Sequence, residues 1–373
     1  MIEFDLSTEL IGIKVKKIKK ETRQVNFGYG GSILNGPIIH GNILYFGAMD
    51  GFLYAVETNG KELWRIELGE RINSSPLVIN HTLYVGCFNS YLYAIDIEKR
   101  EIKWQFRAGD SILSDHDTNN SKDIIYFGSN DGNVYAVSTA NGKELWRFKT
   151  GSNLNACPSY YEGKLYFGST DGYFYCLNAS NGKEMWRFKT GNEVMHRFKL
   201  PFYNGRVFFA SYDGYLYCLS LDGSELWRFP IGKYGSSGSP SIANGVVFHG
   251  DREGYMFAIN ATNGSELWRF KVDKGPISQK PLITCNKIYF GAEDGNLYCL
   301  SLDGKELWRF KTNGLVGTHV VFHNNMIYFG SADCHLYAVD SNSGKKIWQF
   351  TTSTLQQSYL PPRYGAFETE MDV

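Results

Sequence analysis

The sequence DGNVYAVSTANGKELWRF at residues 131–148 decides the fold of this chain, because near copies of it recur along the whole length. Each copy carries one tryptophan: Trp64, Trp104, Trp146, Trp186, Trp227, Trp268, Trp308 and Trp348. Successive tryptophans are 40 to 42 residues apart. A period of this length is typical of solenoids and propellers, in which each copy is one supersecondary unit. We number the eight copies in the order of their tryptophans.

One complete copy, residues 152–191, shows what each unit contains. Apolar runs at 154–161, 163–169, 173–179 and 183–191 predict four strands. Asp-Gly separates the second and third runs, and Asn-Gly separates the third and fourth. We expect both pairs to form two-residue hairpin turns with positive φ at both positions.

Eight units of four antiparallel strands predict an all-β fold, an eight-bladed β-propeller over residues 30–351. Closing the sheets into a ring removes the exposed edges that a repeated hairpin would leave. The composition agrees, because 16% of the residues are aromatic and 40 glycines supply turns. We expect each tryptophan on the outermost strand of its blade, packed against the next blade. An aromatic side chain buries about 150–250 Å², so the eight tryptophans are structural and have no catalytic role.

These motifs resemble the PQQ-like (quinoprotein-type) β-propeller family, whose repeat has the pattern DGxLYAxxxxxGKxLWxF. Residues 131–148 match it, as does DGNLYCLSLDGKELWRF at 294–310. The resemblance covers residues 30–351 and implies eight blades. The family includes quinone-dependent alcohol dehydrogenases as well as scaffolding propellers. Its dehydrogenases combine a vicinal disulfide, a calcium-binding carboxylate and an export signal. This chain has no vicinal Cys pair and no signal region, so we expect neither quinone nor calcium as a cofactor.

The two ends lie outside the repeat. Residues 1–29 carry a basic cluster formed by Lys14, Lys16, Lys17, Lys19, Lys20 and Arg23. This segment is either a basic arm or, as we favour, an extra edge strand protected by lysines. Residues 352–373 form a tail with Pro361-Pro362, three aromatic residues and an acidic end. We expect this tail to be disordered or to act as a short motif for a partner.

Charge and cysteine content narrow the class of protein. Lys plus Arg and Asp plus Glu are 38 each, so the net charge is zero. This balance disfavours a nucleic-acid partner. No apolar run is long enough for a membrane span, and the first residues, MIEFDLSTEL, lack a signal-peptide region. The seven cysteines form no Cys-x-x-Cys pair. We therefore expect a cytoplasmic monomer.

The loops that lead into the first strand of each blade, here called lead-in loops, are where we expect a ligand site, because propellers usually bind near the axis. Most are small or apolar, but those of blades 3 and 5 differ. Blade 3 reads SILSDHDTNNSKD at 111–123, and blade 5 reads NEVMHRFKLP at 192–201. Polar residues in place of a core strand tend to mark function. The expected site, an asymmetric axial funnel, contains Asp115, His116, Asp117, Asn119, His196, Arg197, Lys199, Lys280 and His319.

Several kinds of chemistry fit these residues. His116 and His196 are candidate acid–base catalysts. Asp115 and Asp117 are weak candidates for metal ligands: on one strand they share a side that excludes His116, so no metal is predicted. Arg197, Lys199 and Lys280 suit a carboxylate or phosphate. For the Asp-His-Asp cluster we favour the simpler interpretation, a hydrated loop near the channel; for the three cations a solvated rim is an equally good interpretation.

The leading functional hypothesis is a binding or scaffold propeller that recognises a protein, a peptide or a small polar ligand at the funnel. It rests on near-identical blades, zero net charge and the lack of a complete catalytic constellation. The alternative is a lyase, hydrolase or peptide-modifying enzyme that uses the funnel residues. A second alternative is an enzyme like the quinoprotein dehydrogenases.

Overall fold

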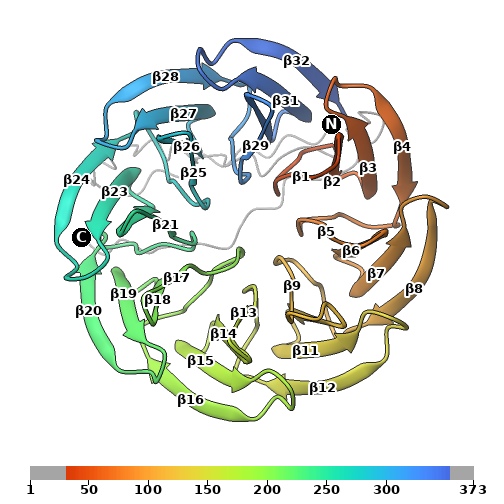
Figure 1. Cartoon of the computed structure of the whole chain (residues 1–373), viewed down its shortest axis with the longest axis horizontal. Helices are drawn as coiled ribbons and strands as arrows, with labels where there is room; N and C mark the ends of the chain where they lie inside the picture. The colour runs from red at the N-terminus through yellow and green to blue at the C-terminus, as the bar shows by residue number, and fades with distance from the viewer. Residues whose placement is uncertain (1–30, 353–373) are drawn as a thin grey trace, which may run out of the picture.

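The computed structural model describes residues 31–352, which form thirty-two strands in eight four-stranded antiparallel sheets. Figure 1 shows the sheets arranged as blades around a central axis, with the first strand of each blade innermost and the fourth on the outer rim. The predicted eight-bladed β-propeller is thus confirmed. Residues 31–352 contain no helix, and therefore none long and apolar enough to cross a membrane.

The strands of the first four blades follow one another in chain order. Blade 1 is β1 (Ile38–His40), β2 (Ile43–Gly47), β3 (Phe52–Glu57) and β4 (Glu62–Glu67). Blade 2 is β5 (Leu77–Ile79), β6 (Thr82–Gly86), β7 (Tyr91–Asp96) and β8 (Glu101–Arg107). Blade 3 is β9 (Asp117–Thr118), β10 (Ile124–Gly128), β11 (Asn133–Ser138) and β12 (Glu144–Lys149). Blade 4 is β13 (Ser159–Tyr161), β14 (Lys164–Gly168), β15 (Tyr173–Asn178) and β16 (Glu184–Lys189).

The last four blades repeat this order. Blade 5 is β17 (Phe202–Tyr203), β18 (Arg206–Ala210), β19 (Tyr215–Ser220) and β20 (Glu225–Pro230). Blade 6 is β21 (Ser241–Ala243), β22 (Val246–Gly250), β23 (Tyr255–Asn260) and β24 (Glu266–Lys271). Blade 7 is β25 (Leu282–Thr284), β26 (Lys287–Gly291), β27 (Asn296–Ser301) and β28 (Glu306–Lys311). Blade 8 is β29 (Val321–His323), β30 (Met326–Gly330), β31 (His335–Asp340) and β32 (Lys346–Thr351).

The tryptophans join each blade to the next, as predicted. Trp146 of blade 3 donates its indole N–H to the carbonyl oxygen of Ala179 in blade 4, at 3.2 Å. Its ring lies against Gly182, where an added Cβ would come within 2.5 Å of the indole. Seven joints have this N–H···O bond, at 2.9 to 3.3 Å, made by Trp104, Trp146, Trp186, Trp227, Trp268, Trp308 and Trp348.

The joint between blades 1 and 2 departs from this pattern. Arg100 occupies the position of the glycine under the indole, with a φ of 61°. A left-handed conformation costs a residue with a Cβ about 1–2 kcal/mol. Within the described chain, Trp64 makes no indole hydrogen bond to blade 2 like those of the other seven joints. Within residues 31–352, the interface between blades 1 and 2 therefore lacks the indole hydrogen bond of the other seven interfaces and has a strained arginine where they have a glycine.

The turns between second and third strands are longer than predicted. Four residues, 169–172, connect β14 and β15, and only Gly172 among them has a positive φ, at 79°. Asp171 shapes the turn: its carboxylate accepts hydrogen bonds from the Tyr173 N–H at 3.0 Å and the Tyr175 hydroxyl at 2.7 Å. It also accepts the N–H of Gly151 in the preceding blade, at 2.8 Å. The expectation of two-residue turns was wrong, because the aspartate side chain holds a wider turn.

The third-to-fourth turns are also wider than two residues. Residues 179–183 connect β15 and β16, and Gly182 alone has a positive φ, at 68°. The Gly182 N–H donates to the carbonyl of Asn178 at 2.9 Å. The glycine is thus required by both the turn and the indole that covers it.

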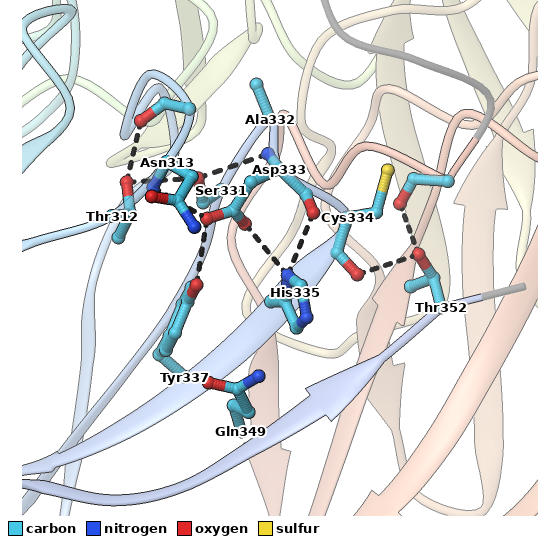
Figure 2. A network of polar contacts seen from close by, with 12 residues as sticks. Thr312, Asn313, Ser331, Ala332, Asp333, Cys334, His335, Tyr337, Gln349 and Thr352 are labelled. Carbon is cyan, nitrogen blue, oxygen red and sulfur yellow. Dashed lines mark hydrogen bonds and ion pairs between the residues drawn. The ribbon is translucent and has the colours of Figure 1, made fainter. Parts of the chain in front are cut away.

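The same aspartate network helps to close the ring at blade 8, as Figure 2 shows. Asp333 accepts hydrogen bonds from the Tyr337 hydroxyl at 2.8 Å and from the Asn313 N–H of blade 7 at 3.0 Å. Thr352 then donates its hydroxyl to the carbonyls of Cys334, at 3.0 Å, and Gly31, at 2.5 Å. The two ends of the described chain therefore meet at this point.

Blades 8 and 1 join without exchanging strands. Trp348 donates to the carbonyl of Thr58 at 3.0 Å, and Ile33 donates its N–H to Ser331 at 3.1 Å. Within residues 31–352, every blade takes its four strands from one continuous segment. The edge strand or basic arm expected over 1–29 and the tail expected over 352–373, apart from Thr352, lie outside the described residues.

Candidate functional site

The lead-in loops and the turns between second and third strands share one face of the ring, here called the loop face. Backbone hydrogen bonds join the two kinds of segment: Tyr212 donates to Glu193 at 2.9 Å, and Arg252 donates to Gly235 at 3.3 Å. Figure 1 shows the lead-in loops reaching toward the axis from all sides. The other turns lie on the opposite face, since strand direction alternates within each blade.

The lead-in loops extend further along the chain than the sequence indicated. The first strand predicted at 154–161 begins only at Ser159, because Pro158 has no N–H to pair and Cys157 donates its N–H to His196 of blade 5 at 2.9 Å. In blade 3, β9 begins only at Asp117. Asp115 and His116 therefore lie in a loop, and the expected alternation of sides along one strand does not hold for them.

The lead-in loop of blade 5 is two residues longer than that of blade 4. Val194 and Leu154 occupy equivalent positions against a glycine of the preceding blade, and Phe202 pairs in its blade as Tyr160 does. The extra length carries Phe198 to the axis, where it is 3% exposed. Its ring packs edge-on against His319 of blade 8, with 5.2 Å between ring centroids. The lead-in loops of blades 5 and 8, three places apart in the ring, thus touch near the axis.

Hydrogen bonds fix this loop to blades 3 and 7 as well. Asp115 donates its N–H to the carbonyl of Arg197 at 3.0 Å. Lys280 donates its ammonium to the carbonyl of Lys199 at 2.7 Å. The blade 5 loop therefore contacts blades 3, 7 and 8 in the region where the sequence suggested an asymmetric funnel.

The two aspartates of blade 3 have different partners. Asp115 accepts the N–H of Ser75 from blade 2 at 3.0 Å, and burial raises its pKa to about 7. Asp117 instead binds the Lys199 ammonium of the blade 5 loop at 2.8 Å and the Tyr160 N–H of blade 4 at 2.7 Å. The pair does not converge on a common point. Residues 31–352 contain no group of three or more His, Cys, Asp or Glu placed to hold a metal ion.

The three histidines of the predicted site are buried or half-buried and neutral. Burial lowers the pKa of His116 to about 3, and its ring packs edge-on near Phe127. Burial also lowers the pKa of His196 to about 3, and its Nε2 accepts the N–H of Gly168 at 2.9 Å. Burial and the Lys280 charge lower the pKa of His319 to about 4. Each ring is part of the packing around the axis.

The three predicted cations are not equivalent. Lys199 is paired with Asp117, and Lys280 is used by a backbone carbonyl. Arg197 is half-buried, and in the described part of the chain its guanidinium makes no hydrogen bond or ion pair. Burial lowers its pKa, while Tyr212 and Asp115 oppose that shift. Arg197 is thus the one cation of the three that remains available to a ligand.

Asn119 is not part of this cluster. It lies between β9 and β10, in a turn on the opposite face, where its side-chain oxygen accepts the N–H groups of Asp123 at 3.1 Å and Ile124 at 3.2 Å. Conversely, sequence reasoning missed Phe198, Ser75 and Tyr212. Only Phe198 had a readable signal, namely the extra length of its loop.

A ring of non-repeating side chains surrounds the axis on the loop face. Each second-to-third turn places one residue just before its Asp, Asn or Glu, and the eight residues are Met49, Phe88, Asn130, Thr170, Tyr212, Arg252, Glu293 and Ala332. No two are alike, although the residues around them repeat from blade to blade. The fold therefore does not dictate which residue occupies this turn position.

Comparison with solved structures finds the same architecture. BamB from Moraxella catarrhalis superposes with a TM-score of 0.68 at 18% identity, covering 84% of this chain and 96% of that one. The computationally designed Ika8 protein gives 0.72 at 16% identity, with coverage of 87% and 98%. Quinohemoprotein alcohol dehydrogenase from Comamonas testosteroni gives 0.64 at 14% identity, with coverage of 75% and 67%. These likenesses show the fold. No curated protein matches the chain.

A family model matches nearly the whole repeat. The model described as outer membrane protein assembly factor BamB matches residues 17–153, 130–229 and 212–359. Together these segments include all eight tryptophan strands. The resemblance to PQQ-like propellers is confirmed, and the chain belongs to the PQQ-repeat propeller family of the assembly factor BamB.

Proposed function

We propose that this chain is a binding propeller that holds a protein or peptide partner on its loop face. The observation that carries the proposal is that a different residue occupies the turn position just before the Asp, Asn or Glu in each of the eight blades. Seven of these residues are half-buried or exposed, while Ala332 is buried. In a tandem repeat, the fold demands similar residues at equivalent core positions, whereas a binding face needs different ones. The family description, an assembly factor, also names a protein that works on other proteins.

An enzyme that uses His116 or His196 is less well supported. A general base works best with a pKa near the operating pH, whereas burial holds both imidazoles near 3. Burial raises the pKa of Asp115 to about 7, which suits acid–base catalysis better than the histidines do. Within residues 31–352 its carboxylate is hydrogen-bonded by Ser75 and by no His, Lys or Arg side chain. Binding therefore explains the site more simply than turnover does.

Site-specific photo-crosslinking tests the proposal in cells that express the full chain. A photoreactive phenylalanine replaces Phe88 or Tyr234 on the loop face and, as matched controls, Leu145 or Leu267 on the outer strands. The controls are as exposed as Tyr234, at 48% and 51% against 50%. We expect one discrete adduct from the loop-face positions, identified by mass spectrometry and reproduced with purified components. Adducts from the outer strands alone would contradict the proposal.

A further inference from the structure

We propose that the junction of blades 5 and 6 is a carboxylate site, in which Arg197 and Arg252 bind an acidic side chain of the peptide partner on either side of Tyr212. The inference rests on the proposed function and adds the chemistry of the ligand. It keeps Arg197 from the three cations expected from the sequence, and it puts Arg252 in the place of Lys199 and Lys280.

Arg197 supplies the first argument. A guanidinium has five N–H donors and no acceptor, so it binds best where an anion accepts several of these donors together. Arg197 is half-buried, and within residues 31–352 its guanidinium has no partner, although neighbouring cations do. A bound carboxylate accepts two of these N–H groups in the bidentate geometry that arginine favours.

Arg252 and Tyr212 supply the second argument. The Arg252 guanidinium stacks on the Tyr212 ring, with 5.3 Å between Cζ and the ring centroid. Tyr212 in turn lies within electrostatic reach of Arg197. Stacking orients a guanidinium and leaves its edge N–H groups free. Tyr212 therefore stacks on the guanidinium of Arg252 and interacts electrostatically with Arg197 of the neighbouring lead-in loop.

The neighbouring turn adds an apolar contact surface. Gly235 has a φ of 56°, and an added Cβ would come within 2.5 Å of the Tyr212 Cα, so the turn packs directly against Tyr212. Tyr234, which precedes Gly235 in this turn, is 50% exposed, and the Lys233 ammonium lies 5.7 Å from its ring centroid. Exposed tyrosine is a frequent anchor for partners because its ring loses little conformational entropy on binding.

The surrounding charge favours a single carboxylate over a polyanion. Glu293 interacts with Arg252, and Asp115 interacts with Arg197. These acids balance part of the positive charge, so a dense polyanion such as nucleic acid meets repulsion here. One glutamate or aspartate beside an apolar residue that covers Tyr234 matches the site best.

Fluorescence polarisation with the full chain provides the test. The probes are two fluorescein-labelled ten-residue peptides: one alternates Glu with Phe and Ser, and the other has Gln at every Glu. We expect the Glu peptide to bind at least about tenfold more tightly, equivalent to about 1.4 kcal/mol. Arg197→Gln and Arg252→Gln should each reduce this preference about three- to tenfold. Arg197→Lys, which keeps the charge without the fork, should restore only part of it.

A matched control comes from the outer rim. Arg187 also packs over a tyrosine, with 5.1 Å to the ring centroid of Tyr173, but it lies far from the axis on β16. Arg187→Gln should leave both affinities unchanged. Thermal melts of all variants separate loss of binding from loss of folding, and the exposed Arg252 serves if Arg197→Gln is unstable.

Three results would overturn the carboxylate site: no preference for the Glu peptide, a preference that survives both arginine substitutions, or tighter binding of a phosphoserine version of that peptide. Crosslinks from Phe88 and Tyr234 would still support the proposed function in each case. Conversely, a lack of such crosslinks would refute the proposed function whatever the peptides do.

Discussion

Replacing Trp146 with alanine tests the joint between blades directly. The indole is half-buried, so its contact with blade 4 removes on the order of 100 Å² from water, which is worth about 2.5 kcal/mol at about 25 cal/mol per Å². Its hydrogen bond to the Ala179 carbonyl adds about 1 kcal/mol. That carbonyl also accepts the Tyr126 hydroxyl at 3.1 Å, so it keeps a partner in the variant. We therefore expect Trp146→Ala to lower the free energy of unfolding by about 3–4 kcal/mol.

Leu145 provides the internal control for this experiment. It precedes Trp146 on the same strand, points to the other side and is 48% exposed. Leu145→Ala should cost less than about 0.5 kcal/mol, as surface substitutions usually do. Urea titrations followed by far-UV circular dichroism give both values. A loss below about 1 kcal/mol for Trp146→Ala, or equal losses for the two variants, would refute the inter-blade role.

Three further predictions follow from individual contacts. Arg100→Gly should stabilise the protein by about 0.5–1 kcal/mol, because it relieves a positive φ under Trp64, whereas Arg100→Ala should not; equal melting temperatures would contradict this. Asp115→Asn should flatten the pH dependence of the melting temperature between about pH 4 and 7. The pKa of Asp115 is about 7 in the folded state and about 3.9 in the unfolded state, so the native state retains a proton and wild-type stability falls as the pH rises through this range. An unchanged slope in the variant would show that folding does not raise the pKa of this carboxyl group. Tyr175→Phe should cost about 1–2 kcal/mol in a urea titration, since it removes a 2.7 Å bond to the Asp171 carboxylate; a neutral result would deny that network a role in stability.

The ring could be predicted from the sequence because its determinants are local and repeated. The interval between tryptophans defines the unit, and four apolar runs within it define the blade. The turn between β14 and β15 could not be predicted in detail. Asp171 accepts an N–H two residues ahead and another from the preceding blade, and this second contact is invisible to a local pattern.

The candidate site was only partly predictable, since its partners come from distant blades. The sequence predicts that Arg197, Lys199 and Lys280, from two lead-in loops, act together on an anion, but Lys199 pairs with Asp117, 82 residues away. Asn119 seemed to belong to the site because it lies in the polar run 111–123, but β9 ends at Thr118, so Asn119 falls in the turn on the opposite face. Tyr212 and Arg252 occupy a turn position that looks unremarkable until its eight occupants are compared around the ring.

The seam between the last and first blades has a mechanical consequence. Seven of the eight joints connect units that are neighbours along the polypeptide, so they form with short loops. The eighth brings Trp348 to Thr58 across 290 residues, using the same indole contact as its counterparts. Loop closure over that length adds an entropic penalty that grows with the logarithm of chain length, and no shared strand locks the ends within residues 31–352. Among the seven joints that share the indole hydrogen bond, the one between blades 8 and 1, where Gly31 and Thr352 meet, should therefore open first on heating or under force.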